Sequence, residues 1–226
     1  MKKEKIEYEA AGVIQAFENI GVDITDYDNL RDGLFIELIN YERNESLLSI
    51  TPHYRLSDLA VVARCGLDTE CGYGSMLVTD PLLEIWNVTP EDILKEAKEN
   101  SELRYPLVFD RLDNFVAGFS PLPELEEMEF PFYYVTNPCY KYGAAAIVYP
   151  GSLERIYEKM GGAFYIIPSS INEMLILPED IEMSEQVLLD MIRDVNDNVV
   201  PKDEVLSYNL YLCKKADCEP EIITGF

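Results

Sequence analysis

Residues 150–168 read PGSLERIYEKMGGAFYIIP, and this stretch predicts a helix followed directly by a strand. The apolar residues of its first part recur at the i, i+3, i+4, i+7 spacing of one helix face. They are Leu153, Ile156, Tyr157 and Met160. Gly161 and Gly162 end the predicted helix, because glycine adopts the left-handed conformation of a helix C-cap without strain. The run Phe164–Pro168 then has the length and composition of a buried strand.

The elements around this stretch extend the pattern. The strand at 164–168 and an apolar run at 173–178 are separated by four residues, which predicts a hairpin. Three further strands are predicted at 132–136, 143–149 and 205–213. The alanines of the second one favour a helix as the alternative.

Ser184 is expected to cap a second helix in this half of the chain. The residues assigned to its apolar face are Val187, Leu188, Met191, Ile192 and Val195. The elements thus follow in the order strand, strand, helix, hairpin, helix, strand. This order predicts an α+β fold with a mostly antiparallel sheet and helices packed on one face, as one domain or as two subdomains.

The first half has weaker signals of the same kind. Strands are predicted at 34–39, 59–63 and 75–79, an amphipathic helix at 7–20, a helical turn at 40–48 and a turn around Gly72 and Gly74. Asp80 and Thr89 are expected to cap two helices, since each precedes a proline that suits the first helical turn. The second of these helices is expected to end near Asn100.

Residues 118–131 combine three prolines with four glutamates and contain no basic residue. This composition is typical of an exposed connection. It is expected to divide the chain into an N-terminal α+β half, residues 1–117, and a C-terminal half, residues 132–226.

The chain is strongly acidic, with 42 Asp and Glu against 18 Lys and Arg and a formal net charge of −24. Direct binding to nucleic acid is not expected, because it requires basic side chains that replace counterions. The acidity is interpreted as a source of solubility or, alternatively, as mimicry of a phosphate backbone. No signal peptide and no apolar run near about 18 residues is found, so a cytoplasmic protein without membrane association is predicted.

The residues of common catalytic sites are scarce. His53 is the one histidine, which excludes a multi-histidine metal site and disfavours a nucleophilic triad. The cysteines are Cys65, Cys71, Cys139, Cys213 and Cys218. None has the short C-x2-C spacing of zinc or redox sites, so buried thiols are expected. The sequence predicts no catalytic residue, no metal and no cofactor, while its many carboxylate pairs leave a hydrolase as an open alternative.

Polar residues gather in three predicted loops that join the elements of the second half. Loops on a rigid sheet are common positions for binding groups, and the free amides at a helix start near Ser152 can accept an anion. The residues predicted to bind a ligand are Asn137, Tyr149, Ser169, Ser170, Asn172 and Glu173. Turn formation is the alternative explanation, because turns require these residue types in any case.

Seven segments within residues 15–212 carry a family resemblance. They are Leu38–Asn44, Pro52–His53, Asp58–Val62, Trp86–Thr89, Val135–Asn137, Tyr142–Gly151 and Ile166–Glu173. They resemble a bacterial family known as domain of unknown function 5688, and the order of elements faintly resembles a second such family, number 1444. The resemblance implies no activity, since none is established for the family. Its hairpin tip reads Ser-Ser-x-His-Glu, and the Asn172 found here keeps hydrogen bonding but gives up proton transfer, which favours binding over catalysis.

The leading hypothesis is therefore a non-enzymatic binding or interaction protein of the bacterial cytoplasm, whose loop face holds a protein, a peptide or a small polar ligand. One alternative is an acidic nucleic-acid mimic that binds a DNA-binding protein and needs a ridge of carboxylates at phosphate spacing. The other is a hydrolase, which needs two carboxylates, or a cysteine and His53, within hydrogen-bond reach in a cleft.

Overall fold

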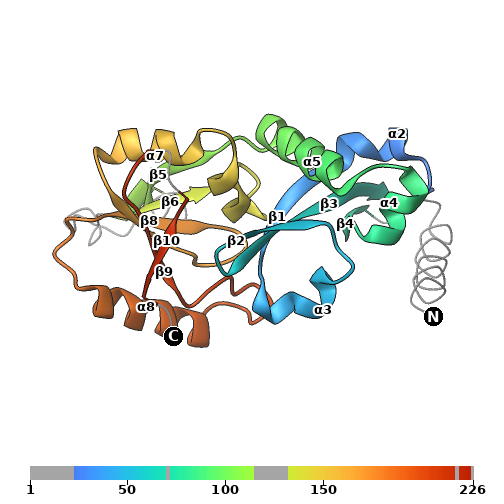
Figure 1. Cartoon of the computed structure of the whole chain (residues 1–226). Helices are drawn as coiled ribbons and strands as arrows, with labels where there is room; N and C mark the ends of the chain where they lie inside the picture. Colours follow the sequence, from blue (N-terminus) through green and yellow to red (C-terminus); the bar gives the residue numbers. More distant parts are fainter. Residues whose placement is uncertain (1–22, 70–71, 115–131, 217–218, 225–226) are drawn as a thin grey trace.

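The computed structural model of the chain describes residues 23–69, 72–114, 132–216 and 219–224 (Figure 1). The helix predicted at 7–20 and the connection predicted at 118–131 lie outside these residues, as do Cys71 and Cys218. The α+β class is confirmed: the described strands form two sheets, and every strand pair is antiparallel. No helix in the described ranges is long and apolar enough to cross a membrane.

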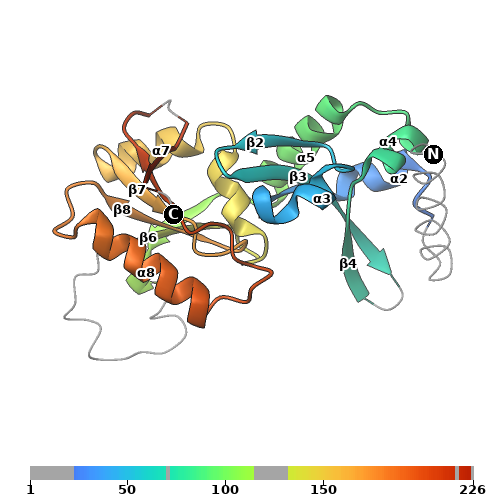
Figure 2. The same cartoon turned by 60° about the horizontal axis from the view of Figure 1, so that its bottom comes forward.

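The first sheet is built around one long strand. It contains β1 (Leu34–Asn40), β2 (His53–Leu56), β3 (Leu59–Thr69) and β4 (Gly72–Leu77). The first part of β3 lies between β1 and β2, whereas its second part pairs with β4. The β3–β4 hairpin therefore projects beyond the rest of the sheet (Figure 2). The turn predicted around Gly72 and Gly74 is wrong, because both residues lie within β4 and pair with β3.

Helices surround this sheet. They are α2 (Tyr27–Leu30), the 3-10 turns η1 (Arg31–Gly33) and η2 (Glu42–Asn44), α3 (Glu45–Leu48), α4 (Asp80–Trp86) and α5 (Pro90–Arg104). The cap predicted at Thr89 is confirmed, since its hydroxyl accepts from the Asp92 amide at 3.2 Å. The cap predicted at Asp80 is wrong by one position, because α4 begins at that residue and Thr79 is the N-cap. Helix α5 continues past Asn100 to Arg104, and its residues Ile93 and Ala97 are fully buried against the sheet.

The second sheet has six strands in the order β10-β9-β7-β8-β6-β5. Their bounds are β5 (Val108–Arg111), β6 (Tyr133–Thr136), β7 (Phe164–Ile167), β8 (Met174–Pro178), β9 (Leu210–Cys213) and β10 (Glu221–Thr224). The predicted hairpin is confirmed as β7 and β8, although its connection has six residues rather than four. Edge strand β5 comes from before the 118–131 segment and pairs with β6 from after it.

Helices cover both faces of this second sheet, which corrects the prediction of one covered face. Helix α7 (Ser152–Met160) lies on one face and α8 (Glu185–Asn198) on the other (Figure 1). Because side chains alternate along a strand, Phe164 and Ile166 pack with Ile156 of α7, while Tyr165 and Ile167 pack with Leu188 of α8. Both predicted helices are confirmed: Gly161 ends α7 with a positive φ of 79°, and the Ser184 hydroxyl accepts from the Val187 amide.

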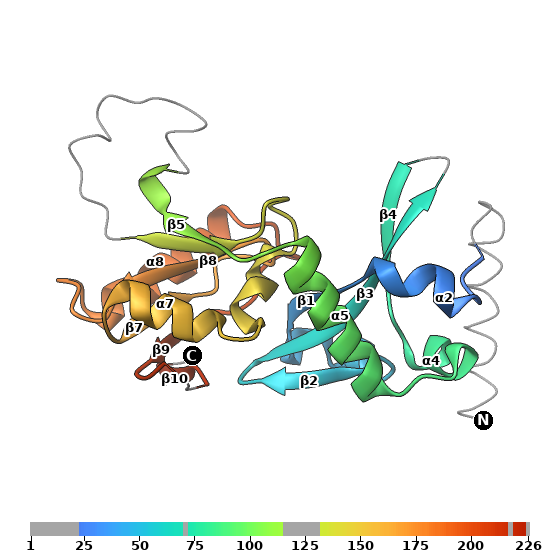
Figure 3. The same ribbon diagram turned by 90° about the horizontal axis from the view of Figure 1, so that it is seen from above.

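One buried segment joins the two sheets. Gly143–Val148 forms the 3-10 helix η4, so the strand predicted at 143–149 is wrong and the helical alternative is the closer one. Its three alanines are fully buried. They belong to one core that contains Leu34 and Ile36 of the first sheet together with Val135 and Ile176 of the second. The small alanine side chains let the backbone of η4 pass closely between the sheets, with α5 beside it (Figure 3).

A polar joint fastens the β2–β3 turn to the C-terminal segment. Asp58 accepts three side-chain hydrogen bonds, from Ser207 Oγ at 2.6 Å, Asn209 Nδ2 at 2.9 Å and the Tyr211 hydroxyl. Asn40 and Arg43 of the first half also donate to backbone carbonyls within residues 202–206. Residues 205–209 are therefore held as an irregular connection, and the strand predicted at 205–213 is confined to β9.

Candidate functional site

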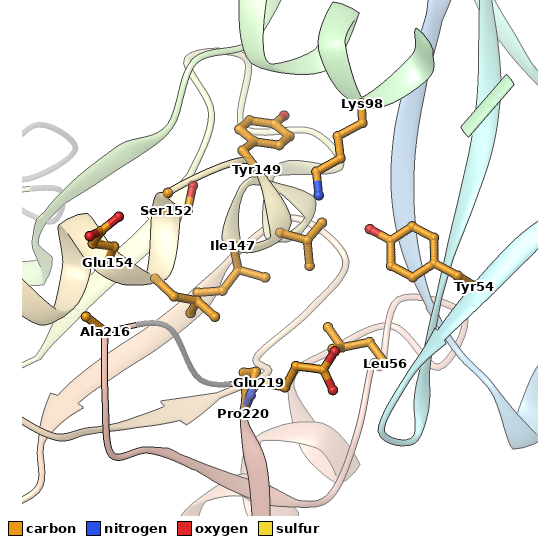
Figure 4. Close-up of a pocket in the computed structure, with 13 residues that line it drawn as sticks. Tyr54, Leu56, Lys98, Ile147, Tyr149, Ser152, Glu154, Ala216, Glu219 and Pro220 are labelled. Carbon is orange, nitrogen blue, oxygen red and sulfur yellow. The ribbon is translucent and has the colours of Figure 1, made fainter. Parts of the chain in front are cut away.

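A hollow opens where the two sheets meet, and we call it the inter-sheet hollow (Figure 4). Its volume is about 360 Å³, and segments far apart in the sequence form its walls. The lining residues are Tyr54, Leu56, Lys98, Ile147, Val148, Tyr149, Gly151, Ser152, Leu153, Glu154, Ala216, Glu219 and Pro220. This volume lies at the lower end of the range of small-molecule sites, which occur preferentially at the boundaries between structural units.

Lys98 supplies the cation of the inter-sheet hollow. It extends from α5, and its amine points into the same open space as the Tyr54 hydroxyl of β2 (Figure 4). Burial lowers the pKa of Lys98, and the nearby charge of Glu102 partly offsets that effect. None of the ion pairs found in the described ranges includes Lys98. The amine is thus partly buried, with the charge of Glu102 nearby but with no carboxylate of the described residues bound to it in an ion pair.

Hydroxyl groups add further donors to the wall. Tyr54 is 37 % exposed, and its partial burial raises the pKa of its hydroxyl to about 12, so that it stays protonated at neutral pH. Ser152 is 1 % exposed and its Oγ has no hydrogen-bond partner. It is the first residue of α7, following Gly151 at φ 71°, and its amide donates to the Tyr149 carbonyl at 3.1 Å, so the positive end of the α7 dipole lies at this wall.

The remaining walls are apolar or acidic. Leu56, Ile147, Val148 and Leu153 supply aliphatic surface, whereas Glu154 and Glu219 are exposed. The Glu219 carboxylate lies across the hollow from the Lys98 amine (Figure 4). The hollow therefore offers a cationic side, an apolar wall and an acidic edge.

Tyr149 separates this hollow from a second pocket of about 240 Å³. Its hydroxyl is hydrogen-bonded with Ser101, whose Oγ accepts from the Ile36 amide on β1.

The cations near this second pocket already interact with other side chains. Arg64 and Lys141 both lie over the Tyr142 ring, at 5.2 and 5.3 Å from its centroid. Arg64 also pairs at 3.0 Å with the buried carboxylate of Glu37.

The structure brings most of the predicted ligand-binding residues together, at the meeting of the 137–143 and 168–173 loops. The buried Asn137 donates to the Lys141 carbonyl and accepts from the Cys139 amide, both at 2.9 Å. Asn172 accepts from the Tyr142 amide at 3.1 Å and donates to Glu204 at 3.0 Å.

The hairpin tip forms its own hydrogen bonds within this loop meeting. Ser170 donates to Glu173 at 2.8 Å and accepts from the Asn172 amide. Ser169 is half-buried beside it, and Tyr149 stands apart as the wall between the two pockets. The side chains of the tip thus hold the loops together, and ligand binding by them stays a prediction.

The hydrolase alternative stays a prediction, and His53 lies outside the lining of the inter-sheet hollow. Its Nδ1 lies 2.8 Å from the Thr51 carbonyl oxygen, and its ring packs against Tyr41. No group of three or more His, Cys, Asp or Glu residues in the described ranges could hold a metal ion.

The reactivity of the cysteine thiols tests the burial of these side chains in the structure. Cys65 and Cys213 are buried and Cys139 is exposed, and burial raises the pKa of Cys65 to about 11. We expect iodoacetamide at pH 8 to modify Cys139 and to leave Cys65 unmodified until the chain unfolds, since the thiolate is the reactive form. Because the folded pKa is raised, this thiol contributes stability below pH 9 that is lost as pH rises through about 11. Peptide mass mapping gives the result, and rapid modification of Cys65 in the folded chain would contradict it.

The fold and the hollow together define an α+β protein with a ligand-sized site between two antiparallel sheets. The chain belongs to DUF5688, a family of unknown function, whose model matches residues 5–215. The fainter likeness to family 1444 is not supported. No curated protein and no solved structure matches the chain.

Proposed function

We propose that this chain is a non-enzymatic binding protein that holds a small carboxylate-bearing ligand in the inter-sheet hollow. The observation that carries this proposal is Lys98, a half-buried amine that forms none of the ion pairs of the described residues, inside a chain of net charge −24. A carboxylate beside this amine restores the interactions that the charged form loses on burial.

The other walls support a ligand of mixed character. The Tyr54 hydroxyl and the start of α7 are further donors for an anion. The aliphatic wall formed by Leu56, Ile147 and Leu153 suits a short apolar body, and Glu219 accepts from an amine or hydroxyl at the other end. The ligand class is therefore a short aliphatic carboxylate, with or without an amino group.

Binding is favoured over hydrolysis because the imidazole of His53 faces a backbone carbonyl and lies outside the lining of the hollow. The cytoplasmic location and the bacterial source stay predictions. So does ligand binding by the six predicted loop residues, which are Asn137, Tyr149, Ser169, Ser170, Asn172 and Glu173.

Replacing Lys98 with methionine should reduce the stabilisation that carboxylates give to the fold. We expect the wild-type chain to gain about 2.7 kcal/mol at a ligand concentration a hundredfold above Kd, which corresponds to a rise in Tm of about 5–10 °C. Lys98→Met should weaken binding at least about tenfold, because the charge-assisted hydrogen bond is lost while the aliphatic stem remains. Thermal unfolding is measured with a panel of short aliphatic carboxylates and amino acids, and with the matched amides.

Lys95→Met is the matched control, since Lys95 lies on the same helix with a side chain that is 75 % exposed. It should bind as the wild type does. The proposal fails if no carboxylate stabilises the wild type, or if Lys98→Met is stabilised equally well.

A further inference from the structure

Helix α8 carries a row of exposed apolar residues, none of which lines the inter-sheet hollow. Val187, Met191 and Val195 are 47 %, 37 % and 36 % exposed and follow one another at i+4 spacing. Met183 just before the helix and Val199 at its C-cap continue the row, at 38 % and 73 % exposed. We call these five residues the α8 ridge.

The α8 ridge is separate from the face by which α8 packs on the sheet. Leu188, Leu189 and Ile192 are at most 4 % exposed and form the core beneath the helix. The single apolar face predicted from Val187 to Val195 is therefore wrong in part, because only Leu188 and Ile192 of that set are buried. Residues spaced by four form a ridge that can lie in the groove of a second helix.

Acidic residues border the α8 ridge. Asp190 and Asp194 occupy the next row around the helix, and both are exposed. Arg193 is the one basic residue of α8 and pairs with Asp190 at 3.4 Å. Negative charge therefore dominates the side of the ridge that faces solvent.

We infer that the α8 ridge docks a basic amphipathic helix of a partner protein. The apolar ridge needs a groove of aliphatic side chains, and the bordering aspartates need Lys or Arg along the edge of that groove. A second copy of this chain is disfavoured as the occupant, because two copies each with a net charge of −24 would bring their aspartates together. Anionic lipid is disfavoured for the same reason.

The full chain is tested with a fluorescent synthetic helix of about 18 residues, long enough to follow α8, with leucines at i, i+3, i+4 spacing flanked by lysines. Two further probes are a scrambled peptide of the same composition and a peptide with glutamates in place of the lysines. Fluorescence anisotropy at about 0.15 M salt should show that only the amphipathic basic peptide binds tightly.

Met191→Lys should weaken binding of this peptide about tenfold or more, since it places a charge at the centre of the ridge. Val187→Lys is a second variant with the same expected effect. With two variants, a folding defect in one of them does not decide the result. Leu103→Lys is the matched control, because Leu103 is 84 % exposed on α5, and it should leave binding unchanged. Asp190→Asn with Asp194→Asn should weaken binding and reduce its salt dependence.

Equal binding of the scrambled peptide, or equal binding by Met191→Lys and Leu103→Lys, would overturn the inference by showing attraction to net charge alone. A wild-type dimer in sedimentation that Met191→Lys dissociates would also overturn it, because a second copy would then occupy the ridge.

Discussion

Gly143→Ala is expected to lower the free energy of unfolding by about 3 kcal/mol or more, because the added methyl group has no room in the folded chain. A Cβ atom at this position would lie 2.1 Å from Thr136 Oγ1, 2.6 Å from the Asn172 carbonyl oxygen and 2.8 Å from the Asn137 amide. Two of these three atoms are backbone, so no change of side-chain rotamer relieves the contact.

The physical reason lies in the way η4 enters the core. Gly143 is the first residue of η4, at the point where the 137–143 loop meets the hairpin tip. The Thr136 hydroxyl donates to the Asn172 carbonyl oxygen at 2.7 Å across this contact. A methyl group here must separate the two loops or displace η4 from between the sheets.

Gly162→Ala is the matched control, because nothing lies within 4 Å of a Cβ built at that position. Its effect should stay within about 0.5 kcal/mol. Chemical denaturation of both variants measures the difference. Equal stability of the two variants would contradict the close approach of the loops at Gly143.

Asp58→Ala is expected to cost about 3 kcal/mol of unfolding free energy, because it removes one acceptor from three donors. Ser207 and Tyr211 are 1 % and 3 % exposed, so water cannot easily replace the lost carboxylate. Burial is the largest cause that raises the pKa of the Tyr211 hydroxyl, and the charge and hydrogen bond of Asp58 raise this pKa further. The hydroxyl therefore stays protonated and acts as a donor. The loss should therefore appear as reduced stability of the whole chain.

A double-mutant cycle tests whether Asp58→Ala acts through the shared hydrogen-bond network or only through the loss of a negative charge. Tyr211→Phe combined with Asp58→Ala should show a coupling energy above about 0.5 kcal/mol, as residues of one hydrogen-bond network do. The exposed Asp180 is the control, and Asp180→Ala should change stability by less than about 0.5 kcal/mol. Additive effects of Asp58→Ala and Tyr211→Phe would contradict a shared network.

Local signals in the sequence predict the helices of the second half well. The i, i+3, i+4, i+7 pattern that ends at Gly161 and the cap at Ser184 both correspond to observed helix ends. These signals depend on neighbours within one or two turns, so they do not require the tertiary structure.

The strands that the sequence does not reveal lack such a signal. β2 (His53–Leu56) has an exposed centre, and β5 (Val108–Arg111) is partly buried at all four positions, so neither shows the alternation of a half-buried strand. The apolar run Gly143–Val148 suggests a strand, but the segment forms the 3-10 helix η4. Its conformation depends on burial between the two sheets, which local sequence does not reveal.

The inter-sheet hollow could be predicted only in part. Tyr149 is among the predicted ligand-binding residues and does line the hollow, whereas Lys98 lies within a regular helix where its spacing suggests a solvated face. Further wall residues are Tyr54 and Leu56 of β2 together with Ala216, Glu219 and Pro220, whose proximity follows from the joint between Asp58 and the C-terminal segment. No pattern along the sequence places these segments together.

The most direct test of ligand binding in the hollow is a pH titration of Lys98, followed by NMR in the full chain with carbon-13-labelled lysine and assigned with Lys98→Met. We predict that Lys98 titrates at lower pH than an ordinary lysine side chain, and that a bound carboxylate shifts its titration to higher pH because the charged amine gains a partner. Titration of Lys98 in the ordinary lysine range, with no response to any carboxylate of the panel, would contradict the account.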